Sequence, residues 1–151
     1  MAADASTIHA SAVLVGPKAT LIRGPSGSGK STLAWNLMTA AVQGVLPFAR
    51  LVADDRAYLE TRTGRLLVRP AETLGGLIEV YGLGIRQTEF EPIAVVGLVV
   101  DLTAGDAARN PEAKATSVLI QGVTLPRLPV AVGIAALPLV LAALGIPPAG
   151  N

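Results

Sequence analysis

The sequence contains no cysteine, few charged residues and very few aromatic residues. The absence of cysteine excludes disulfide bonds, thiolate metal sites and cysteine nucleophiles, and it suits a reducing compartment, so we expect a cytoplasmic protein. Only 15% of the 151 residues are charged, 12 basic residues nearly balance 11 acidic ones, and no run of Lys or Arg occurs. Nucleic acids and anionic membrane surfaces attract basic patches, so the sequence predicts neither a nucleic-acid partner nor a membrane partner.

The sequence is rich in apolar residues and in turn-forming residues. Hydrophobic residues make up 51% of the chain, and 16 glycines with 11 prolines indicate short elements joined by many turns. This length and composition predict a single domain over residues 1–151. The uncharged stretch 128–146 is nearly long enough to span a membrane, but two prolines and a glycine interrupt it. We therefore interpret it as a buried strand over 130–134 and a short helix over 139–144.

Hydrophobic periodicity and turn residues predict the main elements. They are a hairpin with strands at 13–15 and 20–22, a helix over 30–43, a strand at 51–53, a second hairpin with strands at 57–60 and 65–69, and strands at 77–81 and 93–100. The strand 93–100 is nearly all aliphatic, so we expect it at the centre of a mixed sheet. Residues 103–116 are polar and lack periodicity, which is typical of a long functional loop.

A glycine-rich segment lies between an apolar strand and the predicted helix. It reads Gly24-Pro25-Ser26-Gly27-Ser28-Gly29-Lys30-Ser31-Thr32, which matches the pattern G-x-x-x-x-G-K-[S/T] in full. The glycines let consecutive backbone N–H groups turn toward one anion, and the helix dipole adds its positive end. We expect Lys30 to reach the β- and γ-phosphates of a nucleotide and Ser31 to bind Mg²⁺. Residues 24–32 are therefore predicted to bind a nucleotide or polyphosphate.

Two adjacent acids, Asp54 and Asp55, follow the apolar run 51–53. One carboxylate could hold Mg²⁺, and the other could accept a proton from an attacking hydroxyl. Neighbouring residues of a strand point to opposite faces, so both acids share one site only if the strand has ended before them. The pair therefore indicates a functional site mainly because it occurs together with the glycine-rich segment.

Four motifs occur in an order that matches a known family: His9 on a first strand, the segment 24–32, Leu51-Val52-Ala53-Asp54-Asp55, and Leu77-Ile78-Glu79-Val80-Tyr81-Gly82-Leu83-Gly84-Ile85. The last motif is the most specific of the four. In this order the chain resembles the catalytic domain of bacterial HPr serine kinase/phosphorylases over about residues 7–145. The resemblance is to a form that lacks the N-terminal domain of the longer members.

The resemblance implies both a fold and a reaction. The fold is α/β with a mixed sheet, containing a P-loop in a core related to that of phosphoenolpyruvate carboxykinase. The reaction is phosphorylation of a serine of the phosphocarrier protein HPr, with ATP or pyrophosphate and Mg²⁺. The reverse reaction releases pyrophosphate from phospho-HPr and inorganic phosphate. Members of the family form hexamers, so the resemblance also implies a homo-oligomer.

The resemblance further implies roles for individual residues. Asp54 resembles the acid on the metal side, and Asp55 resembles the base that accepts the serine proton. His9 resembles a histidine near that base, and Glu79 resembles the signature glutamate near the metal site. Arg109, in the long polar loop, resembles a phosphate-binding arginine.

Tyr81 departs from the family pattern, because it stands where the signature has arginine. A phenol cannot replace a guanidinium in holding a phosphate or a carboxylate. Two alternative functions stay open, one because the shared motifs do not specify the acceptor and one because Tyr81 departs from the family pattern. One is a kinase of the same fold that acts on another substrate, and the other is a nucleotide-binding sensor without catalysis.

Overall fold

The structure, a computed structural model, describes residues 7–145. Eleven strands, two α-helices and one 3-10 helix make up this part of the chain. In chain order they are β1 (Thr7–Ile8), β2 (Ala10–Val15), β3 (Lys18–Arg23), α1 (Lys30–Val42), β4 (Ala49–Ala53), β5 (Ala57–Arg62), β6 (Arg65–Pro70), β7 (Leu77–Val80), β8 (Gly84–Gln87), β9 (Ala94–Leu102), η1 (Ala113–Thr116), β10 (Ser117–Ile120), β11 (Val123–Val130) and α2 (Ala136–Gly145).

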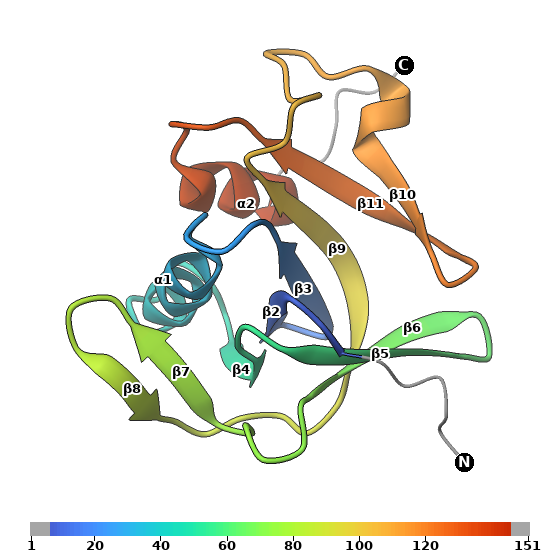
Figure 1. Cartoon of the computed structure of the whole chain (residues 1–151). Helices are drawn as coiled ribbons and strands as arrows, with labels where there is room; N and C mark the ends of the chain where they lie inside the picture. The colour runs from blue at the N-terminus through green and yellow to red at the C-terminus, as the bar shows by residue number, and fades with distance from the viewer. Residues whose placement is uncertain (1–6, 146–151) are drawn as a thin grey trace.

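Nine strands form one curled sheet in the order β1-β5-β6-β9-β3-β2-β4, with β11 beside β9 and β10 beside β11 (Figure 1). Strand β9 pairs with β6 through residues 94–95 and with β11 through residues 99–102, while β3 takes its other edge. Strands β6 and β11 both pair with the edge of β9 that is opposite to β3, β6 near the start of β9 and β11 near its end. The sheet therefore splits into two branches along this edge. The β7–β8 hairpin is separate from this sheet and lies beside α1.

Alternate residues of the central strands belong to two different hydrophobic cores. Ile22 and Val100 face the two helices and belong to one core with Leu37 of α1. Leu21 and Val99 point to the opposite face, where they belong to a second core with residues of β5, β6 and β11. This alternation is the period-2 pattern of a strand buried on both faces.

The predicted fold class, α/β with a P-loop in a core related to phosphoenolpyruvate carboxykinase, is wrong. The described residues form a mostly β structure, a mixed and largely antiparallel half-barrel sheet with only two α-helices. Among the described strand pairs, β3–β9 and β9–β11 are parallel, and the others are antiparallel. The physical reason is that tight turns join most successive strands, and such turns give antiparallel hairpins instead of helical crossovers.

Several individual elements follow the sequence pattern. The hairpins β2–β3 and β5–β6 and the helix α1 confirm the predictions at 13–22, 57–69 and 30–43. The position of β9, which pairs with three strands, confirms the prediction that 93–100 is central. These elements share strong local signals, either a turn between two apolar runs or a helical period.

Other elements differ from the sequence pattern. The predicted strand 130–134 is wrong because β11 ends at Val130 and a turn follows, in which Gly133 has a φ of 81°. The predicted helix 139–144 lies inside α2, and residue 146 of the uncharged stretch is outside the described residues. Strand β10 and its hairpin with β11 were not predicted, although the Gln121-Gly122 turn, with positive φ at both residues, is a hairpin signal. Within residues 7–145, neither helix combines the length and hydropathy that crossing a bilayer requires.

The packing of α1 on the sheet predicts a difference between two truncations in the same helix. Leu37 is fully buried and Val42 is 89% exposed. We expect Leu37→Ala to lower the free energy of unfolding by about 2–5 kcal/mol, because it removes core contacts and leaves a cavity. Val42→Ala should change it by less than about 0.5 kcal/mol. Urea denaturation followed by the fluorescence of Trp35 measures both, and equal effects would contradict the assigned core.

Candidate functional site

The glycine-rich segment forms the connection from β3 to α1. Its backbone bends through left-handed conformations at Gly27 (φ 80°) and Gly29 (φ 103°), which side chains disfavour. Gly29 is the N-cap residue of α1, and neither a side-chain cap nor an acid occupies the first turn. No acidic residue of the first turn itself therefore competes for its N–H groups or for the positive end of the helix dipole.

Lys30 is the first residue of α1 and is only 6% exposed. Its ammonium donates hydrogen bonds to the backbone oxygens of Gly24 at 2.9 Å and Pro25 at 3.2 Å. These contacts hold the cation within the arc of the segment. A buried ammonium beside free helical N–H groups favours an anionic ligand.

The start of the segment is tightly packed. A Cβ atom added at Gly24 would lie 2.5 Å from Ser28 Oγ and 3.1 Å from Leu102 Cβ, so a larger residue there would have to displace the Ser28 side chain and Leu102. Ser28 Oγ is itself buried and has no hydrogen-bond partner among the described residues. An unpaired buried hydroxyl is costly, and a phosphate oxygen is a group that could accept from it.

Asp54 is a buried carboxylate that accepts three hydrogen bonds. It is 7% exposed, and its Oδ1 accepts from Ser11 Oγ at 2.7 Å and from Ser31 Oγ at 2.6 Å. Its Oδ2 accepts from the backbone N–H of Glu79 at 3.0 Å. The acid thereby connects the end of β4 to β2, α1 and β7.

The side chain of Asp55 is exposed, whereas that of Asp54 is buried. Strand β4 ends at Ala53, and Asp55 has a left-handed backbone with a φ of 67°. A non-glycine residue in this region is uncommon and costs energy, which is typical of functional sites. Because the strand has ended, the two acids meet the geometric condition for sharing one site.

A pocket of about 380 Å³ lies at the N-terminal end of α1. The residues that line it come from the segment 26–32 and from Asp55, Glu79 and Tyr81. Tyr81 follows β7 and is 95% exposed. The pocket thus gathers a buried cation, helical N–H groups and carboxylates around one volume.

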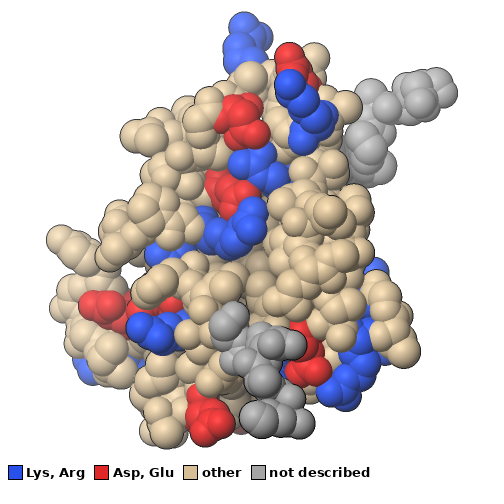
Figure 2. Space-filling model, turned by 45° about the vertical axis from the view of Figure 1, so that its right-hand side comes forward, with Lys and Arg blue, Asp and Glu red and all other residues tan. Residues whose placement is uncertain are grey.

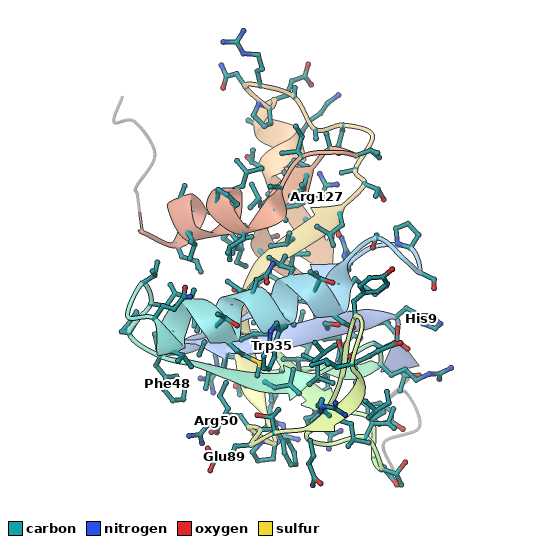
Figure 3. All side chains as sticks on the ribbon, turned by 90° about the vertical axis from the view of Figure 1, so that its left-hand side faces the viewer. His9, Trp35, Phe48, Arg50, Glu89 and Arg127 are labelled. Atoms are coloured by element: carbon teal, nitrogen blue, oxygen red, sulfur yellow. The ribbon has the colours of Figure 1, made fainter. Side chains whose placement is uncertain are left out.

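His9 and Arg109 lie outside this lining. His9 is exposed in a bend between β1 and β2, at the end of the molecule where α1 begins (Figure 3). It precedes Ala10, whose N–H donates to the backbone oxygen of Asp55 at 3.1 Å, so it is a near neighbour of the acid pair. Arg109 is exposed in the loop after β9. The structure therefore brings together the segment 24–32, Asp54, Asp55 and Glu79, but not Arg109.

The oxygen donors at this site fit a hard cation. Ser31, Asp54, Asp55 and Glu79 supply hydroxyl and carboxylate oxygens, which Mg²⁺ prefers. Residues 7–145 contain no cluster of three or more His, Asp or Glu side chains that would form a complete protein metal cage. Mg²⁺ beside a nucleotide usually takes one or two protein ligands and completes its shell with phosphates and water. Ser31 and Asp54 are the two residues that could hold it.

An ionic network that sequence reasoning missed lies where the three neighbouring parallel strands end. Asp101 Oδ1 and Oδ2 accept from Arg23 at 2.7 and 2.8 Å, and Oδ2 also accepts from Arg127 at 2.6 Å. Arg127 in turn donates to Asp106 at 2.8 and 3.1 Å and to the backbone oxygen of Ala115. Figure 2 shows basic and acidic side chains alternating over this side of the molecule. Since Arg23 precedes the glycine-rich segment directly, the network fixes the strand from which that segment starts.

The network shifts the protonation of its members. Burial of Asp101 opposes its ionisation, but the hydrogen bonds and charges of Arg23 and Arg127 outweigh burial and lower the pKa of Asp101. The hydrogen bonds between Arg127 and Asp106 lower the pKa of Asp106 and raise the pKa of Arg127. All of these directions favour the charged forms.

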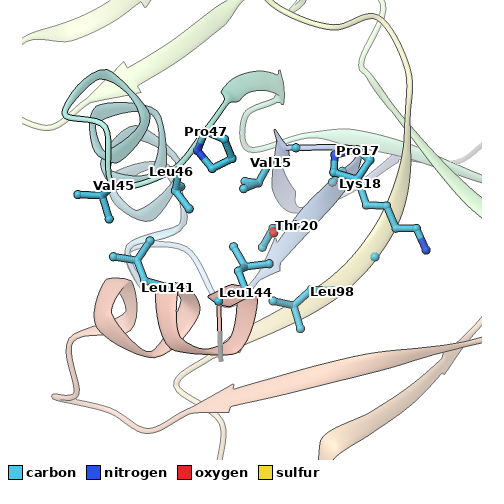
Figure 4. A pocket seen from close by; sticks show the side chains of 14 residues that line it. Val15, Pro17, Lys18, Thr20, Val45, Leu46, Pro47, Leu98, Leu141 and Leu144 are labelled. Atoms are coloured by element: carbon cyan, nitrogen blue, oxygen red, sulfur yellow. The ribbon is translucent and has the colours of Figure 1, made fainter. Parts of the chain in front are cut away.

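A second cavity, of about 480 Å³, lies at the other end of α1 (Figure 4). Its lining is mostly apolar and includes Val45, Leu98 and Leu141, with Thr20 and Lys18 as its polar members. It offers no acid pair and no helix N-terminus. The cavity therefore does not share the chemistry of the pocket beside Lys30.

No protein-family model and no curated protein matches this chain. Among solved structures, the fold is similar to that of an HPr(Ser) kinase/phosphatase. The chain is similar to the HPr(Ser) kinase/phosphatase from Coxiella burnetii, with a TM-score of 0.72 and 20% identity over 92% of this chain and 88% of that chain. At this identity the similarity establishes the fold, and the reaction has to be argued from the site.

The lowered pKa of Asp101 predicts a pH dependence of stability. An acid whose pKa is lower in the folded state stabilises the fold above its ordinary pKa, and this stabilisation is lost as the pH falls through the folded value. We expect the free energy of unfolding to decrease from about pH 4 downward. The free energy of unfolding of Asp101→Asn should be about 1–3 kcal/mol lower than that of the wild type at pH 7, and it should decrease less as the pH falls.

Urea denaturation between pH 7 and pH 2 measures these profiles. Glu89→Gln is the matched control, because the Glu89 side chain is 87% exposed and lies 3.7 Å from Arg50. The control should keep the wild-type profile. A profile of Asp101→Asn parallel to that of the wild type would contradict the role of the network.

Proposed function

We propose that this chain is a phosphotransferase that binds ATP or pyrophosphate with Mg²⁺ and phosphorylates a serine of the phosphocarrier protein HPr. The observation that carries the proposal is the hydrogen bond from Ser31 to Asp54, with Lys30 and Asp55 at the same pocket. It joins the proposed phosphate-binding segment to the proposed metal-side acid. The similarity in fold to an HPr(Ser) kinase/phosphatase supports the choice of reaction and acceptor.

In this proposal the segment 24–32 binds the phosphates. Backbone N–H groups and the dipole of α1 attract the β- and γ-phosphate oxygens, and the ammonium of Lys30 adds a full charge. The hydroxyl of Ser31 and the carboxylate of Asp54 would hold Mg²⁺, which would neutralise charge on the transferred phosphoryl group. The remaining steps depend on the protein side chains.

Asp55 is the proposed general base. Its carboxylate accepts the proton of the incoming serine hydroxyl as the serine oxygen bonds to the γ-phosphorus and the bond to the leaving phosphate oxygen breaks. In the reverse direction an oxygen of inorganic phosphate bonds to the phosphorus of the phosphoserine and the bond from that phosphorus to the serine oxygen breaks. The protonated Asp55 gives its proton to the serine oxygen, and pyrophosphate is the product. Asp55 lines the pocket directly, whereas Asp54 is buried and reaches the pocket lining through its hydrogen bond with Ser31.

The other proposed residues have weaker support. Glu79 lines the pocket and adds a carboxylate near the metal-side acid. His9 is close in the chain to the backbone contact with Asp55, which suits a role beside the base. The geometry of the described residues gives no support to the phosphate-binding role of Arg109. A homo-oligomer, by resemblance a hexamer, and a cytoplasmic location belong to the same proposal.

A nucleotide-binding sensor without catalysis is the second candidate function. The observation that favours it is Tyr81, an exposed phenol at the pocket where the family signature places a cation. A sensor would bind the nucleotide with the same segment but transfer no phosphate. A kinase with another acceptor would bind it and transfer the phosphate elsewhere.

The position of Lys30 predicts a large effect on nucleotide binding. Lys30→Met keeps the length of the buried stem and removes the charge, so we expect Mg-ATP to bind about 10- to 100-fold more weakly. The matched control is Lys114→Ala, because the Lys114 side chain is 86% exposed and lies outside the pocket. Isothermal titration calorimetry measures both. Unchanged affinity of Lys30→Met would contradict the proposed binding segment.

The proposed role of Asp55 predicts that its replacement lowers the rate of phosphate transfer but not the affinity for Mg-ATP. Asp55→Asn suits this position because asparagine tolerates a left-handed backbone. We expect the rate of phosphate transfer to HPr to fall by about two to four orders of magnitude, while the affinity for Mg-ATP stays within a few-fold. The intact mass of HPr after timed incubation gives the rate. Wild-type turnover by Asp55→Asn would contradict the assignment of the base.

A further inference from the structure

Few polar residues are buried among the residues that the structure describes. Within the described part of the chain the buried polar or charged residues are Ser11, Thr20, Lys30 and Asp54. Lys30 and Asp54 belong to the pocket described above, and Thr20 lies beside the apolar cavity. Ser11, on β2, is 0% exposed and has no place in the proposed mechanism so far.

The hydroxyl of Ser11 contacts both acids of the pair. It donates to Asp54 Oδ1 at 2.7 Å and accepts from the backbone N–H of Asp55 at 3.1 Å. A serine hydroxyl has one proton to donate and two lone pairs to accept with, so both bonds form at once. The same hydroxyl thus fixes the carboxylate of Asp54 and the point at which the chain turns into Asp55.

The second donor to Asp54 Oδ1 is Ser31, at 2.6 Å. Because the proton of Ser31 is directed to Asp54, the lone pairs of Ser31 are free to face the pocket, and lone pairs are what a hard cation binds. The orientation of Ser31 therefore depends on where Asp54 Oδ1 lies. Ser11, which is 0% exposed and does not line the pocket, donates to the same oxygen.

We infer that Ser11 is a positioning residue for the metal-binding half of the site. This inference rests on the proposed function of a Mg²⁺-dependent phosphotransferase. Ser11 acts through Asp54 on Ser31 and does not itself contact the nucleotide or the metal. Residues that orient metal ligands by hydrogen bonds typically contribute about 10- to 100-fold to metal affinity. Its removal should affect the Mg²⁺-dependent part of nucleotide binding and leave the metal-independent part unchanged.

The test compares Ser11→Ala with Thr20→Val, which removes another buried hydroxyl on the neighbouring strand, beside the apolar cavity. The affinity of a fluorescent ATP analogue is measured without metal and at increasing Mg²⁺ concentrations. In Ser11→Ala we expect about a tenfold smaller gain in affinity from Mg²⁺ and unchanged metal-free affinity. Thr20→Val should match the wild type in both. A wild-type gain from Mg²⁺ in Ser11→Ala would overturn the inference.

A double-mutant cycle with Ser31→Ala tests the route of the effect. If Ser11 acts through Asp54 on Ser31, adding Ser11→Ala to Ser31→Ala should cause little further loss of the Mg²⁺ gain. Independent, additive losses would overturn the inference. Ser11→Thr, which keeps the hydroxyl, should restore the wild-type gain.

Urea denaturation of each variant separates folding from function. If Ser11→Ala does not unfold cooperatively, Ser11→Cys replaces it, since cysteine is close in size and only a weak donor. We expect Ser11→Cys to show the same loss of the Mg²⁺ gain, and a full gain would overturn the inference. A wild-type protein whose ATP affinity does not respond to Mg²⁺ would instead overturn the proposed function on which the inference rests.

Discussion

The arrangement of the site depends on the hydrogen bonds that the buried carboxylate of Asp54 accepts. A carboxylate in the protein interior is costly unless hydrogen bonds satisfy it. Asp54 accepts from Ser11 on β2, from Ser31 on α1 and from the backbone N–H of Glu79 on β7. Each donor comes from a different element, so this one residue ties the strand that carries it to the helix behind the glycine-rich segment and to the separate hairpin.

A second constraint acts from the other side of the same segment. Arg23 ends β3 and is paired with Asp101 of β9, and Arg127 of β11 completes the contact. These strands are the parallel part of the sheet, so their carboxyl ends meet at one edge. The glycine-rich segment leaves β3 at this edge and enters α1 beside Asp54. It is therefore held at both ends by charged hydrogen bonds, while its glycines allow the backbone to turn between them.

Local signals explain which parts of the molecule could be predicted from the sequence. Helix α1, the hairpins β2–β3 and β5–β6 and the segment 24–32 are each encoded within a few consecutive residues, by helical period, turn chemistry or motif. The contacts of Ser11 with Asp54 and of Arg23 with Asp101 join residues 43 and 78 positions apart. No local pattern carries such pairings. The fold class was wrong for the same reason, since one nucleotide-binding motif does not determine how the remaining strands pair.

We propose that the pocket beside Lys30 transfers phosphate to a serine of a phosphocarrier protein. The most direct measurement uses the wild-type chain, Mg²⁺ and ATP labelled at the γ-phosphorus, with HPr and with an HPr variant whose acceptor serine is replaced by alanine. We expect the label to appear on HPr and to be absent from the variant. Binding of ATP without any labelled HPr would contradict phosphotransfer to this partner, and equal labelling of the two proteins would contradict the serine as acceptor.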